Sequence, residues 1–352
     1  MDAYALAARL DYGFLRWAAR LPRPFALSCC AMRALLRFCF NVEWRSYALK
    51  RRYVRGASAK AYAQLQAKPP ATPGRNLGGL AGGILGGIVV LFYEGVLLRL
   101  QRYLWVLARF WVESVEEFDV IRLADQGLKA GTCSIKGLED LENTCNSQGL
   151  VLLTAHLESL YLPLCHLAAQ GRSIYLAASQ IVEDPQVPAP IRAHFQFKKA
   201  ALETHLGKGH VVYVEQGMAR LVRALQAGAV VVIACDSPAP EASRGFRVGF
   251  LGQVMAMAQG PRWLAMQGQA HIALMSVKRL GFWHYRLDIH GPYLPAKAHL
   301  ASEAMGKKDQ DDAVDAGLQA AYQALDGVIR RAPWRWWAAD LVLRDDPQPF
   351  VG

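Results

Sequence analysis

The second half of the chain alternates short apolar runs with longer amphipathic stretches. Continuous apolar or β-branched runs are typical of strands buried on both faces of a sheet. Such runs lie at residues 150–153, 174–177, 211–214, 230–234 and 272–277, with a later one at 285–289. Residues 312–330 have helical spacing, with apolar side chains on one face at Leu318, Tyr322, Leu325 and Ile329. Strands that alternate with helices predict an α/β fold with a mixed, mostly parallel sheet flanked by helices.

Residues 1–66 show helical spacing instead of strand runs. Apolar side chains recur three to four residues apart at Leu6, Leu10, Phe14 and Trp17. A second apolar stretch at 25–40 is interrupted by Arg33 and Arg37. A span through lipid disfavours two such cations, whereas a helix in the membrane surface keeps them among the headgroups. We therefore expect surface helices; the alternative is a helix packed in a protein core.

Residues 77–93 are seventeen residues without a charge, which is marginal for crossing a bilayer. Glycines recur every four residues along two rows, so another helix can approach this segment closely. A buried packing helix and a short membrane segment remain open for it. A basic cluster at 45–55 suits anionic lipid, and residues 96–115 predict a further apolar helix. The sequence thus divides into a helical membrane-associating region, 1–120, and an α/β domain, 121–352.

Composition narrows the possible partners. The 352 residues are 53% hydrophobic and 20% charged, with a formal net charge of +11. A basic protein can bind nucleic acid, anionic lipid or an acidic protein. No zinc-finger, recognition-helix or RNA-binding motif is present, so the apolar composition favours lipid and an acidic carrier, and we expect no nucleic-acid partner.

The seven cysteines show neither CxxC spacing nor a metal-ligand pattern. They are typical of reduced core residues in a cytoplasmic protein. No metal site is predicted. No cleavable signal peptide is expected either. Asp2 lies where a signal peptide has its basic region, and Arg9 and Arg16 interrupt any apolar core of such a peptide.

The stretch 148–163, QGLVLLTAHLESLYLP, carries the clearest candidate chemistry. His156 follows a buried strand, and the carboxyl ends of strands form the ligand-binding edge of an open α/β sheet. A helix is expected from Leu157, ending near Pro163. Imidazole titrates near neutral pH and can remove a proton from a hydroxyl group. The alternative is a hydrogen-bonded structural histidine.

Several motifs around His156 resemble one enzyme family. They are SIKGLEDL at 134–141, the strand that ends in His156, the strand that ends in Asp236, and FLG at 250–252. In order and spacing, residues 134–294 resemble the bacterial lipid A late acyltransferases of the lysophospholipid-acyltransferase-like superfamily. That family has an acid five residues after its histidine, where this chain has Tyr161.

The resemblance implies a membrane-associated acyltransferase that uses no cofactor. A fatty acyl group would move from an acyl carrier protein thioester, or a CoA thioester, to a hydroxyl of a lipid or related acceptor. His156 would be the general base. A carboxylate normally orients such an imidazole; Glu158 could do so if the turn after His156 brings it to Nδ1, and otherwise Tyr161 could hydrogen-bond the ring. His210 and Glu215 also satisfy H-x4-E, which we interpret as coincidence because the spacer is strand-like.

The other predicted site residues, together with Tyr161, would bind substrate. Arg220 and Arg223 could bind a phosphate of the carrier arm or acceptor, or be solvated helix charges. Phe250 and Gly252 would line the acyl pocket, or form an ordinary turn. Asp236 is expected at the same sheet edge as His156. Its predicted role is positional, holding neighbouring loops or an arginine such as Arg244 or Arg247.

These observations predict a protein on the cytoplasmic face of the bacterial inner membrane, with acyl carrier protein and membrane lipid as partners. The alternative is a non-catalytic acyl-binding or assembly subunit derived from the same family. No G-x-S-x-G elbow, phosphate-binding loop or dinucleotide fingerprint is present, so serine-hydrolase and nucleotide mechanisms have no support.

Overall fold

The structure is a computed structural model. It describes residues 3–40, 62–65, 98–139, 148–185, 187–239, 241–281, 283–294 and 307–343. The glycine-rich segment at 77–93 and the basic cluster at 45–55 lie outside the described residues.

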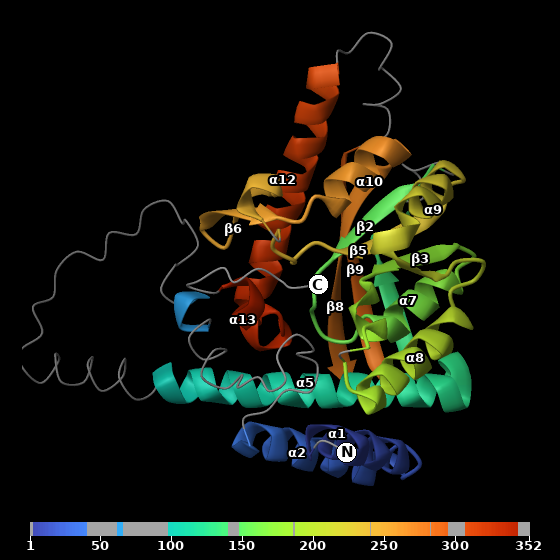
Figure 1. The fold of residues 1–352 in the computed structure, drawn as a ribbon, viewed down its shortest axis with the longest axis vertical. Helices are drawn as coiled ribbons and strands as arrows, with labels where there is room; N and C mark the ends of the chain where they lie inside the picture. Colours follow the sequence, from blue (N-terminus) through green and yellow to red (C-terminus); the bar gives the residue numbers. More distant parts are fainter. Residues whose placement is uncertain are drawn as a thin grey trace, which may run out of the picture.

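A seven-stranded mixed sheet forms the centre of the molecule (Figure 1). Its strands are β1 Thr132–Lys136, β2 Leu150–Thr154, β3 Ile174–Ala178, β4 Val211–Tyr213, β5 Val230–Ala234, β8 His271–Gly281 and β9 His284–Leu294. Their order is β1-β9-β8-β2-β5-β3-β4. The pairs β8–β2, β2–β5, β5–β3 and β3–β4 are parallel, whereas β9 runs antiparallel to β8. The predicted mixed, mostly parallel α/β fold is confirmed.

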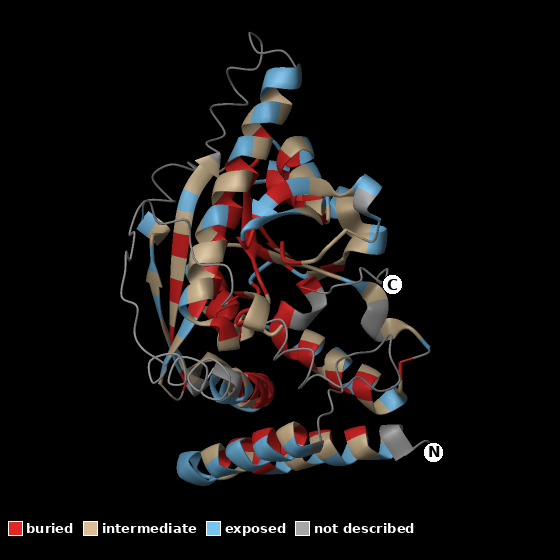
Figure 2. Ribbon diagram, turned by 90° about the vertical axis from the view of Figure 1, so that its left-hand side faces the viewer, coloured by how far each residue is buried: buried red, intermediate tan, exposed pale blue. Residues whose placement is uncertain are grey.

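Helices cover both faces of the sheet. On one face lie α7 Tyr161–Ala168 and α8 Ala189–Glu203; on the other lie α9 Val214–Gln226, α10 Gly260–Gly268 and α12 Lys307–Arg331. Successive side chains of a strand point to opposite faces. Val151 and Leu153 of β2 therefore pack in the core under α9, α10 and α12, and Leu150 and Leu152 pack in the core under α7. Buried residues concentrate between these layers (Figure 2).

Shorter elements complete the α/β part of the chain. They are the hairpin of β6 Phe246–Phe250 and β7 Gln253–Met257, the 3₁₀ turns η2 Gly127–Ala130, η3 Gln180–Glu183, η4 Ala242–Arg244 and η6 Pro333–Arg335, and α13 Ala339–Val342. The hairpin packs on α12, and η6 packs on the long helix α5 Leu98–Gln126.

Several predicted boundaries of helices and strands are wrong. Helix α7 begins at Tyr161 and continues past Pro163, because the N–H groups of a first helical turn have no intrahelical partner and proline is tolerated there. Strand β4 ends at Tyr213, so the predicted last strand residue, Val214, begins α9. Strands β8 and β9 are longer than predicted because they form an antiparallel pair that extends beyond the apolar runs.

The N-terminal helices lie beyond one end of the sheet. Helix α5 crosses this end, and α1 Ala3–Ala18 and α2 Arg23–Phe40 pack on the far side of α5 (Figure 1). The boundary predicted at residue 120 falls inside α5, and the division into two regions stays a prediction. Within the part of the chain that the structure describes, no helix is both long and apolar enough to cross a membrane.

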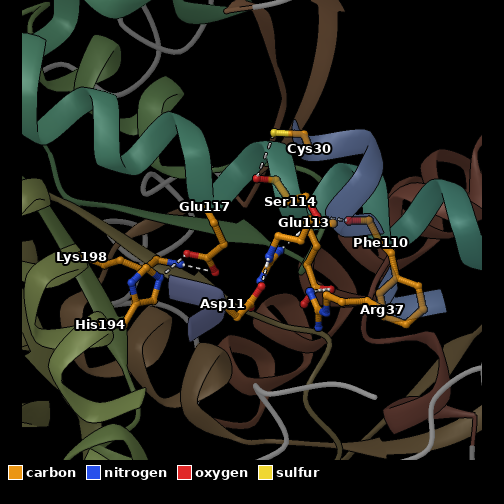
Figure 3. Close-up of polar contacts among 10 residues, drawn as sticks. Asp11, Cys30, Arg37, Phe110, Glu113, Ser114, Glu117, His194 and Lys198 are labelled. Atoms are coloured by element: carbon orange, nitrogen blue, oxygen red, sulfur yellow. Dashed lines mark hydrogen bonds and ion pairs between the residues drawn. The ribbon is translucent and has the colours of Figure 1, made fainter. Parts of the chain in front are cut away.

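The prediction that Arg33 and Arg37 lie among lipid headgroups is wrong. Both side chains are buried. Arg33 forms a two-pronged contact with Asp11 of α1, and an Arg37 nitrogen lies 2.9 Å from a carboxylate oxygen of Glu113 in α5 (Figure 3). Acidic side chains on neighbouring helices therefore compensate the buried guanidinium groups, which removes the need for headgroup contact.

Candidate active site

His156 and Asp236 meet because their strands are neighbours. Thr154 is paired with Ala234 across the parallel strands β2 and β5. His156 lies two residues after Thr154, and Asp236 lies two residues after Ala234. Their side chains therefore project from adjacent strand ends at the same edge of the sheet. The Cys235 N–H donates to the Thr154 carbonyl at 2.8 Å and extends this register past the strand ends.

The two residues form a closely bonded pair. Nδ1 of His156 lies 2.8 Å from Oδ1 of Asp236, and the His156 backbone N–H donates to Oδ2 at 2.8 Å. The Asp236 carboxylate is buried, whereas the His156 side chain keeps 30% of its surface exposed. A hydrogen bond from Nδ1–H to a carboxylate leaves Nε2 of neutral imidazole as a proton acceptor. The pair can therefore remove a proton from a bound hydroxyl.

The electrostatics favour an ionised Asp236. Burial alone would raise its pKa, but the positive charge of His156, its two hydrogen bonds and a third from Trp336 together lower the pKa of the carboxyl below its usual value. Nε1 of Trp336 donates to Oδ2 at 2.8 Å. Asp236 is thus a carboxylate at neutral pH and can stabilise a protonated imidazole.

Glu158 does not contact the His156 ring, so the predicted approach of Glu158 to Nδ1 is wrong. Its backbone is left-handed, with φ of 48°, a conformation that costs a non-glycine residue about 1 kcal/mol. Its buried carboxylate lies 2.9 Å from Nε of Arg335 and accepts a hydrogen bond from the Arg279 backbone N–H. Burial raises the pKa of Glu158, although Arg335 and Arg279 act against this shift.

The observed partners of Asp236 differ in part from the predicted ones. The sequence predicts that Asp236 holds either neighbouring loops or an arginine such as Arg244 or Arg247, and the structure agrees with the loops and not with the arginines. Arg244 instead pairs with Glu241 at 3.1 Å in an exposed position, and Arg247 is an exposed residue of β6. The groups that Asp236 holds are His156 and Trp336.

Tyr161 is the first residue of α7. The Lys198 ammonium lies 4.6 Å from the centre of its ring, and Lys198 also pairs with Glu117 of α5 at 3.1 Å. These contacts direct the ring toward α8 and α5. Nδ1 of His156, the atom that an orienting group must bind, is already taken by Asp236.

Arg220 and Arg223 lie exposed on α9. This helix starts directly after β4, at the carboxyl edge of the sheet, and runs back toward the start of β5. At about 1.5 Å per residue, Arg220 lies roughly 9 Å along the helix from Val214 and Arg223 lies farther still. The structure therefore places both arginines away from the edge that carries His156.

Phe250 and Gly252 belong to the turn between β6 and β7. Leu251 and Gly252 both have positive φ, 55° and 77°, and Phe250 pairs with Gln253, as in a two-residue hairpin turn. Gly252 is exposed in this turn. Phe250 is buried, and its ring centre lies 6.1 Å from that of Trp336. Phe250 thus lies next to a residue that binds Asp236.

Trp336 is the contact residue that the sequence did not single out. The sequence does show three tryptophans after Pro333, at positions 334, 336 and 337. No local pattern indicates which of these three side chains reaches the end of a strand. Among the described residues, no group of histidine, cysteine and acidic side chains could hold a metal ion.

Comparisons with known proteins add little to this geometry. No protein-family model matches the chain, and no curated protein matches it by sequence. Among solved structures, it is similar to the crystal structure of the 1-acyl-sn-glycerophosphate (LPA) acyltransferase PlsC from Thermotoga maritima. The TM-score is 0.29, with 13% sequence identity over 76% of this chain and 98% of that chain. So slight a likeness carries no argument, and the fold and site rest on the chain's own strands and side chains.

Proposed function

We propose that the protein is an acyltransferase in which His156 is the general base and Asp236 orients it. The observation that carries this proposal is the buried carboxylate of Asp236 bound to Nδ1 of a partly exposed histidine at the carboxyl edge of a parallel sheet. The motifs at 134–141 and 250–252, which resemble the lipid A late acyltransferases, support acyl transfer over other reactions that use a base.

In the proposed reaction the acceptor hydroxyl gives its proton to Nε2 of His156 while its oxygen attacks the thioester carbonyl carbon. The carbon–sulfur bond then breaks, the acyl oxygen ester forms, and the leaving thiolate takes the proton from the imidazolium. Asp236 stabilises the imidazolium in between, as the third group of a catalytic triad does. No cofactor takes part; the acyl thioester is a co-substrate.

The donor and the acceptor are those that the resemblance implies, and the positive net charge of the protein suits an acidic donor. A net charge of +11 suits an acidic acyl carrier protein as the thioester donor, and a CoA thioester fits the same chemistry. The acceptor in this proposal is a membrane lipid or a related hydroxylated molecule. The location is the cytoplasmic face of the bacterial inner membrane.

Membrane association is supported by the outer surface of the N-terminal helices. Large apolar side chains are exposed on α1 and α2; they are Leu6, Leu10, Trp17, Phe25, Met32, Leu35 and Leu36. Exposed arginines at 9, 16, 20 and 23 accompany them. An apolar face rimmed by cations fits an anionic membrane surface. Helix α5 separates these helices from the sheet end that it crosses (Figure 1).

The test is expression of wild type, His156→Ala and His210→Ala in a bacterial host, with mass spectrometry of total lipids and metabolites. His210 is the matched control because it heads the other H-x4-E sequence and is exposed. We expect an acylated product with wild type and His210→Ala but not with His156→Ala. Purified protein with an acyl carrier protein thioester provides the same comparison in vitro. Equal thioester consumption by wild type and His156→Ala would reject the proposal and favour the non-catalytic acyl-binding subunit.

A further inference from the structure

The segment that contains η6 and the two residues after it lies against the loop that carries His156. The Trp337 N–H donates to the His156 carbonyl at 3.1 Å, and the Glu158 N–H donates to the Arg335 carbonyl at 3.0 Å. These two bonds form a short antiparallel pair between segments that are far apart in the sequence. These two hydrogen bonds therefore fix the backbone of the loop that carries His156.

Trp336 lies between these two bonds and points at the buried carboxylate. It is fully buried, and its Nε1 donates to Oδ2 of Asp236 at 2.8 Å. The same oxygen accepts the His156 backbone N–H, while Oδ1 meets Nδ1. Donors on both oxygens, from two separate segments, fix the rotation of the carboxylate and thereby the plane of the imidazole.

The ion pair of Glu158 and Arg335 holds the same segment by its side chains. The Glu158 carboxylate is buried and also accepts the Arg279 backbone N–H, so it is held by β8 as well as by η6. A left-handed backbone at Glu158 directs its side chain to this pair and away from the imidazole. Glu158 thus connects the histidine loop, β8 and η6.

Aromatic contacts anchor the segment at each side of Trp336. The Trp334 ring packs against Trp105 of α5 with 6.1 Å between ring centres. The rings of Trp337 and His156 make an edge-to-face contact with 4.3 Å between ring centres. Trp334 therefore contributes to anchoring without touching the dyad, which makes it the control position for the test below.

We propose that Trp336 is a positioning residue of the dyad, and that the Glu158–Arg335 ion pair holds the segment that places it. Trp336 acts through Asp236 and does not touch substrate. This inference rests on the proposed acyl transfer, because it assigns a role within the same site, and it predicts an effect on the His156 hydrogen bond that can be measured without any substrate.

The first measurement is the proton NMR signal of Nδ1–H of His156 in the full chain, identified by its loss in His156→Ala. Trp336 is replaced by benzothienylalanine, an isostere of tryptophan with sulfur in place of the N–H, and Trp336→Phe provides a genetically encoded counterpart. Trp334 receives the isostere alone, which keeps the ring that packs on Trp105. Circular dichroism and melting curves establish which proteins are folded as wild type is.

We expect the isostere at Trp336 to shift or broaden the His156 signal, and to displace the pH titration of His156. The value of kcat for acyl carrier protein thioester should fall roughly tenfold at unchanged KM, a fraction of the 10²–10⁴ that a positioned base contributes. The isostere at Trp334 should leave the signal, the titration and kcat as in wild type. If the His156 signal and its pH titration stayed unchanged when the Trp336 N–H is removed, the inference would be overturned.

Glu158→Gln tests the second part of the proposal, that the Glu158–Arg335 ion pair holds the segment that places Trp336. We expect it to broaden the same signal in wild type and to add no further change in the protein that carries the isostere at Trp336. Equal changes in both backgrounds would mean that Glu158 acts independently of Trp336, and that part would be rejected. If the signals respond but no protein transfers an acyl group, the proposed function fails while the positioning role stands.

Discussion

At the residue scale, a carboxylate from a neighbouring strand provides what the histidine loop itself lacks. The position five residues after His156 is Tyr161, which contacts Lys198, and the nearest acid, Glu158, is bound to Arg335. Asp236 reaches Nδ1 because β5 pairs with β2 in a register that brings the two strand ends together. The acid of such a dyad can therefore come from a different strand than its base.

We predict that Asp236→Asn lowers kcat for acyl transfer by roughly 10³- to 10⁴-fold, because an amide cannot hold the imidazole in the productive tautomer or stabilise its protonated form. Initial rates with an acyl carrier protein thioester measure this effect. Glu241→Gln, which removes the exposed partner of Arg244, is the control and should match wild type. A loss below tenfold for Asp236→Asn would contradict the assigned role.

A second residue-scale prediction concerns Asp119 in α5. Burial raises its pKa from 3.8 to about 7, with a contribution from Glu116, while Arg279 and Arg122 act in the opposite direction. The folded protein thus binds a proton that the unfolded chain releases. The stability contribution of Asp119 is full below its unfolded pKa and is lost as pH rises through about 7.

The measurement is the melting temperature from about pH 5 to about pH 8, a range that covers the larger part of the loss. We expect Asp119→Asn to lose less melting temperature over this range than wild type does. Asp125→Asn, an exposed position of the same helix, should follow wild type. Parallel pH profiles for wild type and Asp119→Asn would contradict the raised pKa.

At the element scale, the N-terminal helix pair is held by buried polar contacts as well as by an apolar core. Arg33 of α2 contacts Asp11 of α1 and donates to Ser114 of α5, and Arg37 of α2 pairs with Glu113 of α5 (Figure 3). Buried charges tolerate one arrangement of partners and strongly disfavour others. The packing of α1 and α2 on α5 is accordingly specific in register.

We predict that Asp11→Ala lowers the free energy of unfolding by roughly 3 kcal/mol, because it leaves the buried guanidinium of Arg33 without its carboxylate. Denaturant unfolding measures this value. Arg244→Ala removes an exposed pair and should cost less than about 1 kcal/mol. If the two variants were equally stable, the buried pair would contribute no more than a surface pair.

At the scale of the whole molecule, the proposed orientation at a membrane places α1 and α2 in the lipid surface, with α5 between them and the sheet. Their exposed apolar side chains, with the arginines around them, form the contact. Burial of one large apolar side chain contributes roughly 1.5–3 kcal/mol to such binding. Single substitutions in this face should therefore be measurable.

We predict that Phe25→Glu weakens binding to vesicles that contain phosphatidylglycerol by at least about tenfold, from lost apolar burial and repulsion by anionic lipid. Val254→Glu in β7 is the matched control, since Phe25 is 64% exposed and Val254 is 66% exposed. Vesicle sedimentation measures both. Equal binding of the two variants would place the membrane contact elsewhere on the protein.

The sequence by itself determined the local features of this protein. Apolar runs predicted β2 and β5 to within a residue, and the ends of these runs placed His156 and Asp236 just after the strands. Such features depend on interactions between near neighbours in the chain, so a pattern a few residues long is enough to predict them. The α/β fold class followed from the alternation of these elements.

Only the tertiary structure decided which distant side chains meet. His156 and Asp236 are 80 residues apart, and Trp336 lies a further 100 residues from Asp236. The neighbours of β2 in the sheet, the burial of Arg33 and Arg37 against α1 and α5, and the diversion of Glu158 to Arg335 all depend on packing between elements. Contacts of this kind leave no periodic trace in a sequence, because the free energy that selects them comes from the assembled core and not from any one segment.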